Sequence, residues 1–131
     1  VRVGIWHGEW SAMARLDGYM AIGGLRDGVH VLSPGSRGMA RHTASGGKDL
    51  VLGQIHSSCG LGCILGTKGV SVGPNRDAMG QGGAGGSLGF ADPDNKISLG
   101  FTMNQMHPGI TAWKTATDVA DSVYKTLNVN T

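Results

Sequence analysis

The chain has 131 residues and a formal net charge of +2, with 40% hydrophobic and 15% charged residues. This balance excludes a chain kept disordered by its charge, and without a run of Lys or Arg it gives no sign of a nucleic-acid partner. Its 24 glycines follow no Gly-X-Y period, which excludes collagen. The length fits one domain.

Two long segments without Asp, Glu, Lys or Arg, 50–67 and 78–91, are interrupted by Gly, Ser and Gln. We therefore expect no membrane span. The chain begins with Val rather than Met, so we expect a processed chain or a piece of a longer protein. Its two cysteines do not make a disulfide framework, and nothing in the sequence indicates a cellular compartment.

The first predicted element is a helix over residues 11–22, with Ser11 as a suitable N-cap. The pair Gly23-Gly24 would end this helix, because glycine tolerates the left-handed conformation of a C-cap. The helix prediction depends on apolar residues at spacings of three and four, which are Met13, Leu16 and Met20.

A turn is predicted at 26–28, followed by an extended run over 29–32. The pair Ser33-Pro34 is typical of the start of a helix, with serine as the cap and proline in the first turn. Gly35 and Gly38 would each cost this helix about 1 kcal/mol relative to alanine, so we expect it to be short.

Further along, residues 43–54 are predicted as loop and 66–79 as a connection. Strands are predicted at 60–65, 80–91 and 97–103, the last two forming a β-hairpin around a turn at Asp92-Pro93-Asp94-Asn95.

The last predicted element is a helix over 111–128, which carries a continuous apolar stripe. Strands in succession followed by a helix indicate an α+β fold, with an antiparallel sheet flanked by helices and the last helix packed on the hairpin. The stripe consists of Trp113, Ala116, Ala120, Val123, Tyr124 and Leu127.

Two glycine-rich patterns match known motifs, but their surroundings do not suit the chemistry. The segment Gly69-Val70-Ser71-Val72-Gly73 has the spacing of an α/β-hydrolase nucleophile elbow, which needs a helix after the serine, whereas Pro74-Asn75 follows. The pattern Gly80-x-Gly82-x-x-Gly85 has the spacing of a dinucleotide-binding loop, but a strand pattern follows it. We therefore expect no elbow and no nucleotide cofactor.

Two further patterns match known motifs, but their local structure or spacing does not suit the chemistry. Ser45-Gly46-Gly47-Lys48 matches Ser-x-x-Lys, which requires both side chains on one helix face, and its glycines oppose a helix. Cys59 and Cys63, with His56 nearby, would lie about 13 Å apart on one strand, too far for one zinc ion or one disulfide. We expect two buried strand cysteines, no metal and no cofactor.

A longer pattern is more specific: GQGGAGGSLGFADP at 80–93, followed by LGFTMNQM at 99–106. It closely resembles the β-lactamase-related serine hydrolases, which include class C β-lactamases, D-alanyl-D-alanine peptidases and family VIII esterases. The segments 14–24, 27–34 and 60–62 are similar to the same family, so the resemblance covers about residues 11–127.

The resemblance implies that residues 1–131 are the C-terminal portion of a single domain that hydrolyses a small ester or amide through an acyl-serine intermediate. Of the family's motifs, Ser-x-x-Lys, Tyr-x-Asn and Lys/His-Thr/Gly-Gly, only the third has a counterpart, at Gln81-Gly82-Gly83. By position, the Ala84 N–H would form half of the oxyanion hole. The nucleophile and Tyr-x-Asn would lie upstream, outside this chain.

Gln81 departs from the family pattern, because a glutamine carries neither charge nor a titratable proton. This leaves open a second hypothesis, a non-catalytic relative used for binding or assembly. A third hypothesis is a small independent α+β enzyme that uses Ser71 with His107. Because the family's sheet has further strands from its N-terminal part, we also expect the isolated chain to expose an unpaired strand edge and to self-associate.

Overall fold

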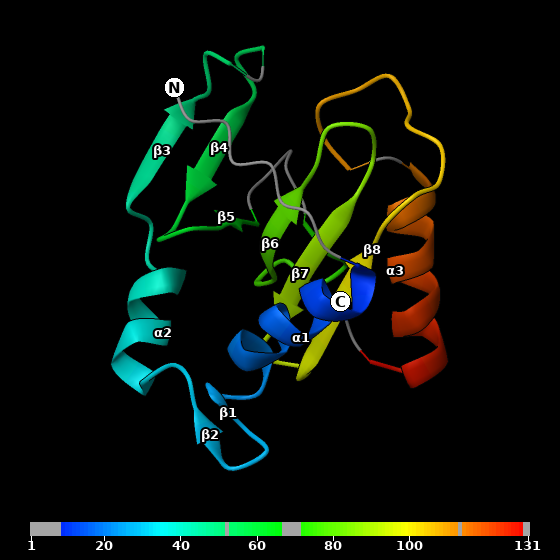
Figure 1. Ribbon diagram of the computed structural model, residues 1–131. Coiled ribbons are helices and arrows are strands. Elements are labelled where there is room, and N and C mark those ends of the chain that lie inside the picture. The colour runs from blue at the N-terminus through cyan, green and yellow to red at the C-terminus, as the bar shows by residue number, and fades with distance from the viewer. Residues whose placement is uncertain (1–8, 52, 67–71, 113, 130–131) are drawn as a thin grey trace.

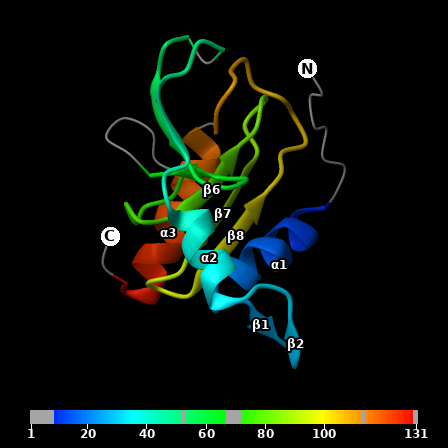
Figure 2. The same cartoon turned by 90° about the vertical axis from the view of Figure 1, so that its left-hand side faces the viewer.

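The computed structural model describes residues 9–51, 53–66, 72–112 and 114–129. Their main feature is a six-stranded antiparallel sheet in the order β3-β4-β5-β6-β7-β8, so that every strand pairs with its neighbour in sequence. Helices α1 and α3 lie on opposite sides of the β6–β8 half of the sheet, as Figure 1 and the rotated view in Figure 2 show. The predicted α+β class, an antiparallel sheet flanked by helices, is confirmed.

The described elements are α1 (Trp10–Ala21), β1 (Leu25–Arg26), β2 (Val29–His30), α2 (Pro34–Arg41), β3 (Ser45–Lys48), β4 (His56–Cys59), β5 (Ile64–Leu65), β6 (Met79–Gly82), β7 (Leu88–Asp92), β8 (Ile97–Phe101) and α3 (Lys114–Leu127).

The main core lies between α3 and one face of β7 and β8, because successive side chains of a strand point to opposite faces. The predicted stripe on α3 is confirmed for its central residues, while Val123 is partly buried. Leu127 is 55% exposed, so its predicted burial is wrong, and Trp113 lies outside the described residues. The buried core residues are Val72, Ala78, Leu88, Phe90, Ile97, Leu99, Ala116, Ala120 and Tyr124.

The other face of the sheet lies very close to α1, and glycine makes this approach possible. A Cβ added at Gly100 would lie 2.5 Å from the carbonyl oxygen of Trp10 and 2.9 Å from the amide nitrogen of Ala14. The Ser98 hydroxyl donates a hydrogen bond to the Ala14 carbonyl at 2.9 Å. The glycine of β8 therefore serves the packing of a helix, and a larger residue there would push α1 off the sheet.

The ends of the first two helices follow local sequence signals. Gly23 and Gly24 have φ angles of 98° and 83°, so the predicted glycine stop of α1 is confirmed. The predicted Ser11 cap is wrong: Glu9 occupies the N-cap position, and the Ser11 hydroxyl donates to its carboxylate. At α2, the Ser33 hydroxyl accepts from the Ser36 amide at 3.0 Å, as expected for a cap followed by proline.

Three strand predictions need correction. Residues 43–54, predicted as loop, contain β3, which gains its strand conformation by pairing with β4 rather than from its own propensity. The strand predicted over 60–65 is reduced to β5, because Gly60 donates to the Cys63 carbonyl at 2.9 Å and closes a turn. The strand predicted over 80–91 is two strands, β6 and β7.

The reversal between β6 and β7 depends on two glycines in the middle of that segment. Gly85 and Gly86 have φ angles of 89° and 111°, a region that disfavours residues with a side chain. The hairpin of β7 and β8 is confirmed, with its turn at 93–96 rather than at the predicted 92–95. The glycine-rich segment is thus partly strand and partly turn.

A buried carboxylate joins this hairpin to α3. The Asp92 side chain is fully buried and accepts hydrogen bonds from the Asn75 side chain and from the Tyr124 hydroxyl. It also accepts bonds from the backbone amides of Asp94 and Asn95 and from the Asn95 side chain. Burial raises the pKa of Asp92, but these donors, Tyr124 foremost, outweigh burial and hold the pKa below its ordinary value.

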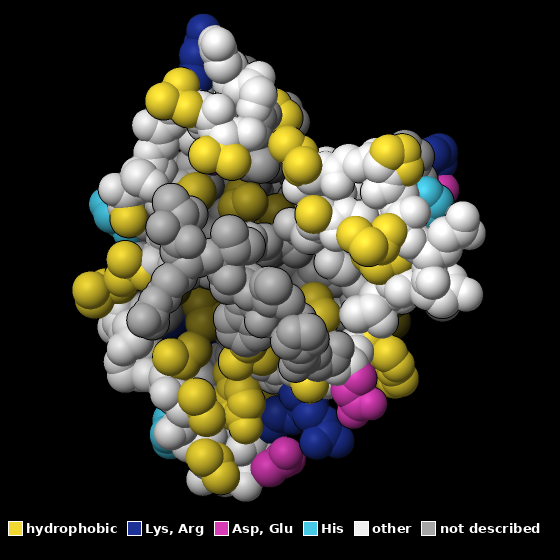
Figure 3. Space-filling view, turned by 45° about the horizontal axis from the view of Figure 1, so that its top comes forward, with side chains coloured by type: hydrophobic (Ala, Val, Ile, Leu, Met, Phe, Trp, Pro, Cys, Tyr) yellow, Lys and Arg dark blue, Asp and Glu magenta, His cyan; other side chains and the backbone are white. Residues whose placement is uncertain are grey.

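On the face shown in Figure 3, the largest group of Lys and Arg side chains lies near the lower edge between acidic side chains. Among the described residues, no helix has the length and apolar character needed to cross a membrane.

Candidate functional site

The pairing of β6 with β7 determines which main-chain groups of β6 remain available for further hydrogen bonds. Gly83 donates to the Ser87 carbonyl at 2.8 Å, so these two residues form a hydrogen-bonded pair at the end of the ladder. Bonded and non-bonded pairs alternate in an antiparallel ladder. Gly82, opposite Leu88, therefore turns its N–H and C=O groups away from β7.

The strand on the other side of β6 covers only its first half. β5 has two residues, and these pair with Gly80 and Met79. Beyond Gly80, no described strand pairs with β6 on this side, and the outward groups of Gly82 make no hydrogen bond to the described residues. Among the described residues, the second half of β6 is thus an unpaired strand edge.

A tight turn continues this edge. Gly86 donates to the Gly83 carbonyl at 3.0 Å, and Gly85 at the third turn position has a positive φ angle, which together indicate a type II turn. Ala84 is the second residue of this turn and is exposed. Its amide makes no hydrogen bond within the described part of the chain.

The turn is held from outside by the segment after β8. Gly85 donates to the Gly109 carbonyl at 3.1 Å and its own carbonyl accepts from the His107 amide at 2.9 Å. The Met106 side chain fills the space where a Cβ at Gly85 would lie, with its methyl carbon 2.8 Å from that position. Sequence reasoning missed this support, for which the turn-forming pair Pro108-Gly109 was the available signal.

The four predicted site residues occupy consecutive positions on this edge and turn. Gln81 is exposed, Gly82 and Gly83 are half-buried, and Ala84 is exposed. Gln81 lies directly opposite Gly89, on the face of the sheet that α1 covers. The structure thus brings the amides of Gly82 and Ala84, which make no hydrogen bond to described residues, and one carboxamide together at the end of β6.

The other motif residues lie elsewhere. Ser45 and Lys48 belong to β3, and because they are three positions apart on a strand they point to opposite faces, unlike a helical Ser-x-x-Lys pair. Ser71 lies outside the described residues. In the described ranges, no group of three or more His, Cys, Asp and Glu side chains gathers as a metal site would need.

The two cysteines are free and half-buried, not buried on one strand as predicted. The turn at 60–63 separates them, so the distance expected from a single strand does not apply. Cys59 pairs with Ile64 and shares its face of the sheet, whereas Cys63 packs with Leu65 near α1. Their side chains therefore point to opposite faces.

Sequence reasoning also missed Asp17, a largely buried carboxyl on α1. Burial raises the pKa of Asp17 to about 6. Within the described residues it makes no hydrogen bond or ion pair. An added Cβ at Gly89 would lie 2.9 Å from its Oδ2 atom, so the carboxyl occupies space that the missing side chain leaves on β7.

The raised pKa makes a prediction for stability. Because the folded-state pKa lies above the ordinary 3.8, the folded chain favours protonated Asp17, and its stability falls as the pH rises from about 4 through 6. We expect Asp17→Asn to raise the free energy of unfolding at pH 8 by about 1–3 kcal/mol and to leave it unchanged near pH 3. Urea unfolding at both pH values measures this, with the exposed Asp121→Asn as control; an equal effect at both pH values would contradict it.

Comparison with known proteins bears on the fold. No family model and no curated protein sequence matches the chain. Among solved structures, a penicillin-binding protein homologue from Caulobacter crescentus is 31% identical to this chain, with a TM-score of 0.81. The match covers 88% of this chain and 31% of that one. A family VIII carboxylesterase is 29% identical, with a TM-score of 0.77, and this match covers 86% of this chain and 30% of the esterase.

EstA from Arthrobacter nitroguajacolicus Rue61a shares the fold, with a TM-score of 0.69 at 24% identity. The match covers 91% of this chain and 32% of the EstA chain. The chain thus spans slightly less than a third of the length of the solved structures it matches. Its fold and its similarity to the first two structures identify it as part of a domain of the β-lactamase-related group, to which penicillin-binding protein homologues and family VIII carboxylesterases belong.

Proposed function

We propose that the chain is the C-terminal portion of a domain that hydrolyses a small ester or amide through an acyl-serine intermediate. In this proposal Gln81, Gly82 and Gly83 line the acyl group, and the Ala84 N–H donates to the oxyanion of the tetrahedral intermediate. The nucleophilic serine belongs to the remainder of the domain.

The observation that carries the proposal is the unpaired edge of β6. The N–H and C=O groups of Gly82 point outward and make no hydrogen bond to described residues, so an extended acyl group can pair with them as an added strand does. Because Ala84 lies two residues after Gly82 and its amide makes no hydrogen bond to described residues, a carbonyl carbon at the end of such a group would place its oxygen near a main-chain donor.

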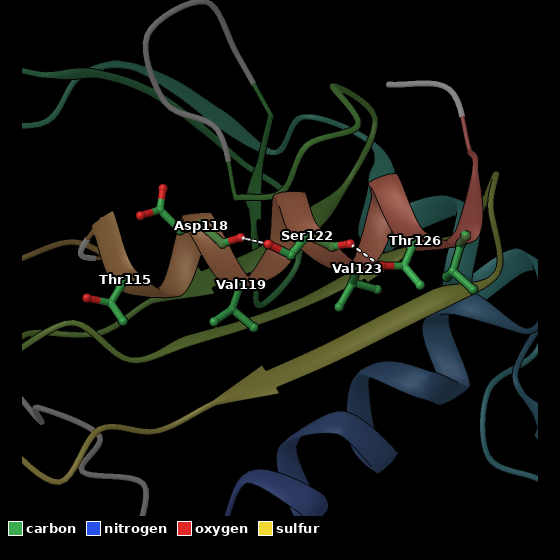
Figure 4. A pocket seen from close by; sticks show the side chains of 7 residues that line it. Thr115, Asp118, Val119, Ser122, Val123 and Thr126 are labelled. Atoms are coloured by element: carbon green, nitrogen blue, oxygen red, sulfur yellow. Dashed lines mark hydrogen bonds between the residues drawn. The ribbon is translucent and has the colours of Figure 1, made fainter.

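The second supporting feature is the outer edge of β8, with which no further described strand pairs although helices cover both faces of β8. A shallow hollow along α3 adjoins this region, and in Figure 4 Val119 and Val123 project from α3 on the side where β8 passes. An edge strand buried on both faces is typical of a sheet that continues with another strand. We infer that further chain of the same domain covers this edge.

The experiment is to treat the protein made from its complete natural gene with a fluorescent fluorophosphonate and to map the labelled residue. We expect one serine outside residues 1–131 to be modified, and no labelling of this chain when it is expressed alone. A modified serine within this chain would contradict the proposal.

Gln81 supports a second candidate function, that of a non-catalytic relative used for binding or assembly, because its side chain cannot take or give a proton as Lys or His does. Failure of the folded full-length protein to form any fluorophosphonate adduct would favour this candidate over the first.

The outer edge of β8 also predicts how the isolated chain behaves. Its outward main-chain groups can pair with a second copy, so we expect self-association that increases with concentration. Sedimentation velocity over a hundredfold range of concentration measures this, and a monomer throughout the range would contradict it.

A further inference from the structure

The segment 102–112, which follows β8, returns to the unpaired edge of β6 and lies along it. At one end of this contact, Gly85 donates a hydrogen bond to the Gly109 carbonyl at 3.1 Å. At the other end, a Cβ added at Gly82 would lie 2.5 Å from the amide nitrogen of Ala112 and 3.1 Å from its Cβ. Figures 1 and 2 both show this segment beside the β6–β7 turn. Its last residues therefore form a wall along the edge between Gly82 and Gly85.

This wall stands on the α3 side of the sheet. Gly82 lies opposite Leu88, which belongs to the core between the sheet and α3, and directly opposed residues of a ladder share one face. Gln81, one position earlier, belongs to the other face, which α1 covers. An extended ligand that pairs with Gly82 would therefore direct the substituent opposite Gly82 to the α3 side, toward the wall.

The wall and the turn beside it carry two exposed apolar side chains. Ile110 is 52% exposed and directly follows Gly109, so its Cα lies about 3.8 Å from that of a residue bonded to the turn. Met106 is 72% exposed, and three of its side-chain carbons lie within 3.3 Å of the Cβ position of Gly85. A ligand that covers these side chains gains free energy from removing their apolar surface from water.

The surroundings of the edge offer little to a charged substituent. The segments 79–87 and 102–112 contain no Asp, Glu, Lys or Arg, and His107 is their only residue with an ionisable side chain. The first cation after the wall, Lys114, is bound to the Asp118 carboxylate at 2.6 Å. A ligand carboxylate that faced the wall would lose water without gaining a cationic partner from these segments, which is unfavourable.

We propose that Met106 and Ile110 are specificity-determining residues of the β6 edge, and that they select an uncharged ester or amide with an apolar acyl group. This inference rests on the proposed function, since it names the substrate class of the same site. The two side chains contact the acyl substituent that faces the wall rather than the reacting carbonyl. Their effect on the rate therefore depends on which acyl group the substrate carries.

The test compares two alkylphosphonofluoridates of equal length on the full-length protein, one with a plain alkyl chain and one whose chain ends in a carboxylate. With both probes the serine oxygen bonds to phosphorus and fluoride leaves, so only the chain differs. Intact-mass spectrometry gives the two labelling rates. We expect the alkyl probe to react at least about 10-fold faster, and Ile110→Arg to lower this ratio by about 10-fold or more. Met106→Gln should lower the ratio in the same direction.

Val29→Arg is the matched control, because it adds the same charge at a side chain of similar exposure, 56%, on β2 at the opposite end of the molecule from the β6–β7 turn (Figure 1). It should leave the ratio unchanged. Equal rates for the two probes in the wild type, or an unchanged ratio in folded Ile110→Arg, would overturn the inference. If Ile110→Arg does not fold, an unchanged ratio in Met106→Gln overturns it instead. Reaction with neither probe would overturn the proposed function, and this inference with it, so the two failures are distinguishable.

Discussion

In the full-length protein, Ala84→Pro should slow formation of the acyl-enzyme by about 10²–10³-fold, because it removes one main-chain donor from the oxyanion hole. The substitution suits the local backbone. Ala84 is the second residue of a type II turn, a position that proline favours, and its amide makes no hydrogen bond to described residues that the proline would break.

Ala84→Ser is the matched control, since it adds a side chain at the same place but keeps the N–H. We expect near-normal acylation in this variant and unchanged thermal stability in both. The measurement is the rate of fluorophosphonate labelling at a fixed probe concentration. Equal rates in the wild type and Ala84→Pro would show that this amide does not contact the oxyanion.

For the fold, Asp92→Ala should lower the free energy of unfolding by about 3–5 kcal/mol. The alanine leaves the buried Tyr124 hydroxyl and the half-buried amides of Asn75 and Asn95 without their acceptor. Because the folded-state pKa of Asp92 lies below its ordinary value, its contribution is present at neutral pH and is lost as the pH falls below about 4.

Asp94→Ala is the comparison for this prediction. Its carboxylate is about half exposed and lies 3.5 Å from Arg41, so its removal should cost less than about 1 kcal/mol. If Asp92→Ala does not fold, Tyr124→Phe provides a milder variant that removes only one donor, with an expected loss of about 1–2 kcal/mol. Urea unfolding at pH 7 measures all three; a loss no larger for Asp92→Ala than for Asp94→Ala would contradict the role of the buried network.

Features that depend on a few adjacent residues were predictable from the sequence. The stop at Gly23-Gly24, the cap at Ser33 and the buried face of α3 at Ala116 and Ala120 were all correct. Each depends on backbone conformation or on periodicity within one element, so no knowledge of distant segments is needed.

Features that arise from pairing between segments were not predictable in this way. β3 has the sequence Ser-Gly-Gly-Lys, which carries little strand propensity, and it is a strand because β4 lies beside it. In 80–91 the same residue type serves as strand at Gly82 and as turn at Gly85, so composition alone could not place the boundary. The residues Gln81, Gly82, Gly83 and Ala84 were selected through family resemblance, and their role remains a prediction that the Ala84 experiment addresses.

The order of strands in the sheet has a consequence for how the chain acquires its structure. Every strand from β3 to β8 pairs with its sequence neighbour, so each ladder closes only a short loop of chain. By contrast, the hydrogen bond between Ser98 and Ala14 joins residues 84 positions apart. Local pairings carry a lower entropy cost than distant ones. We therefore expect the β6–β8 ladders to assemble first and α1, with Asp17, to dock on a sheet that is already formed.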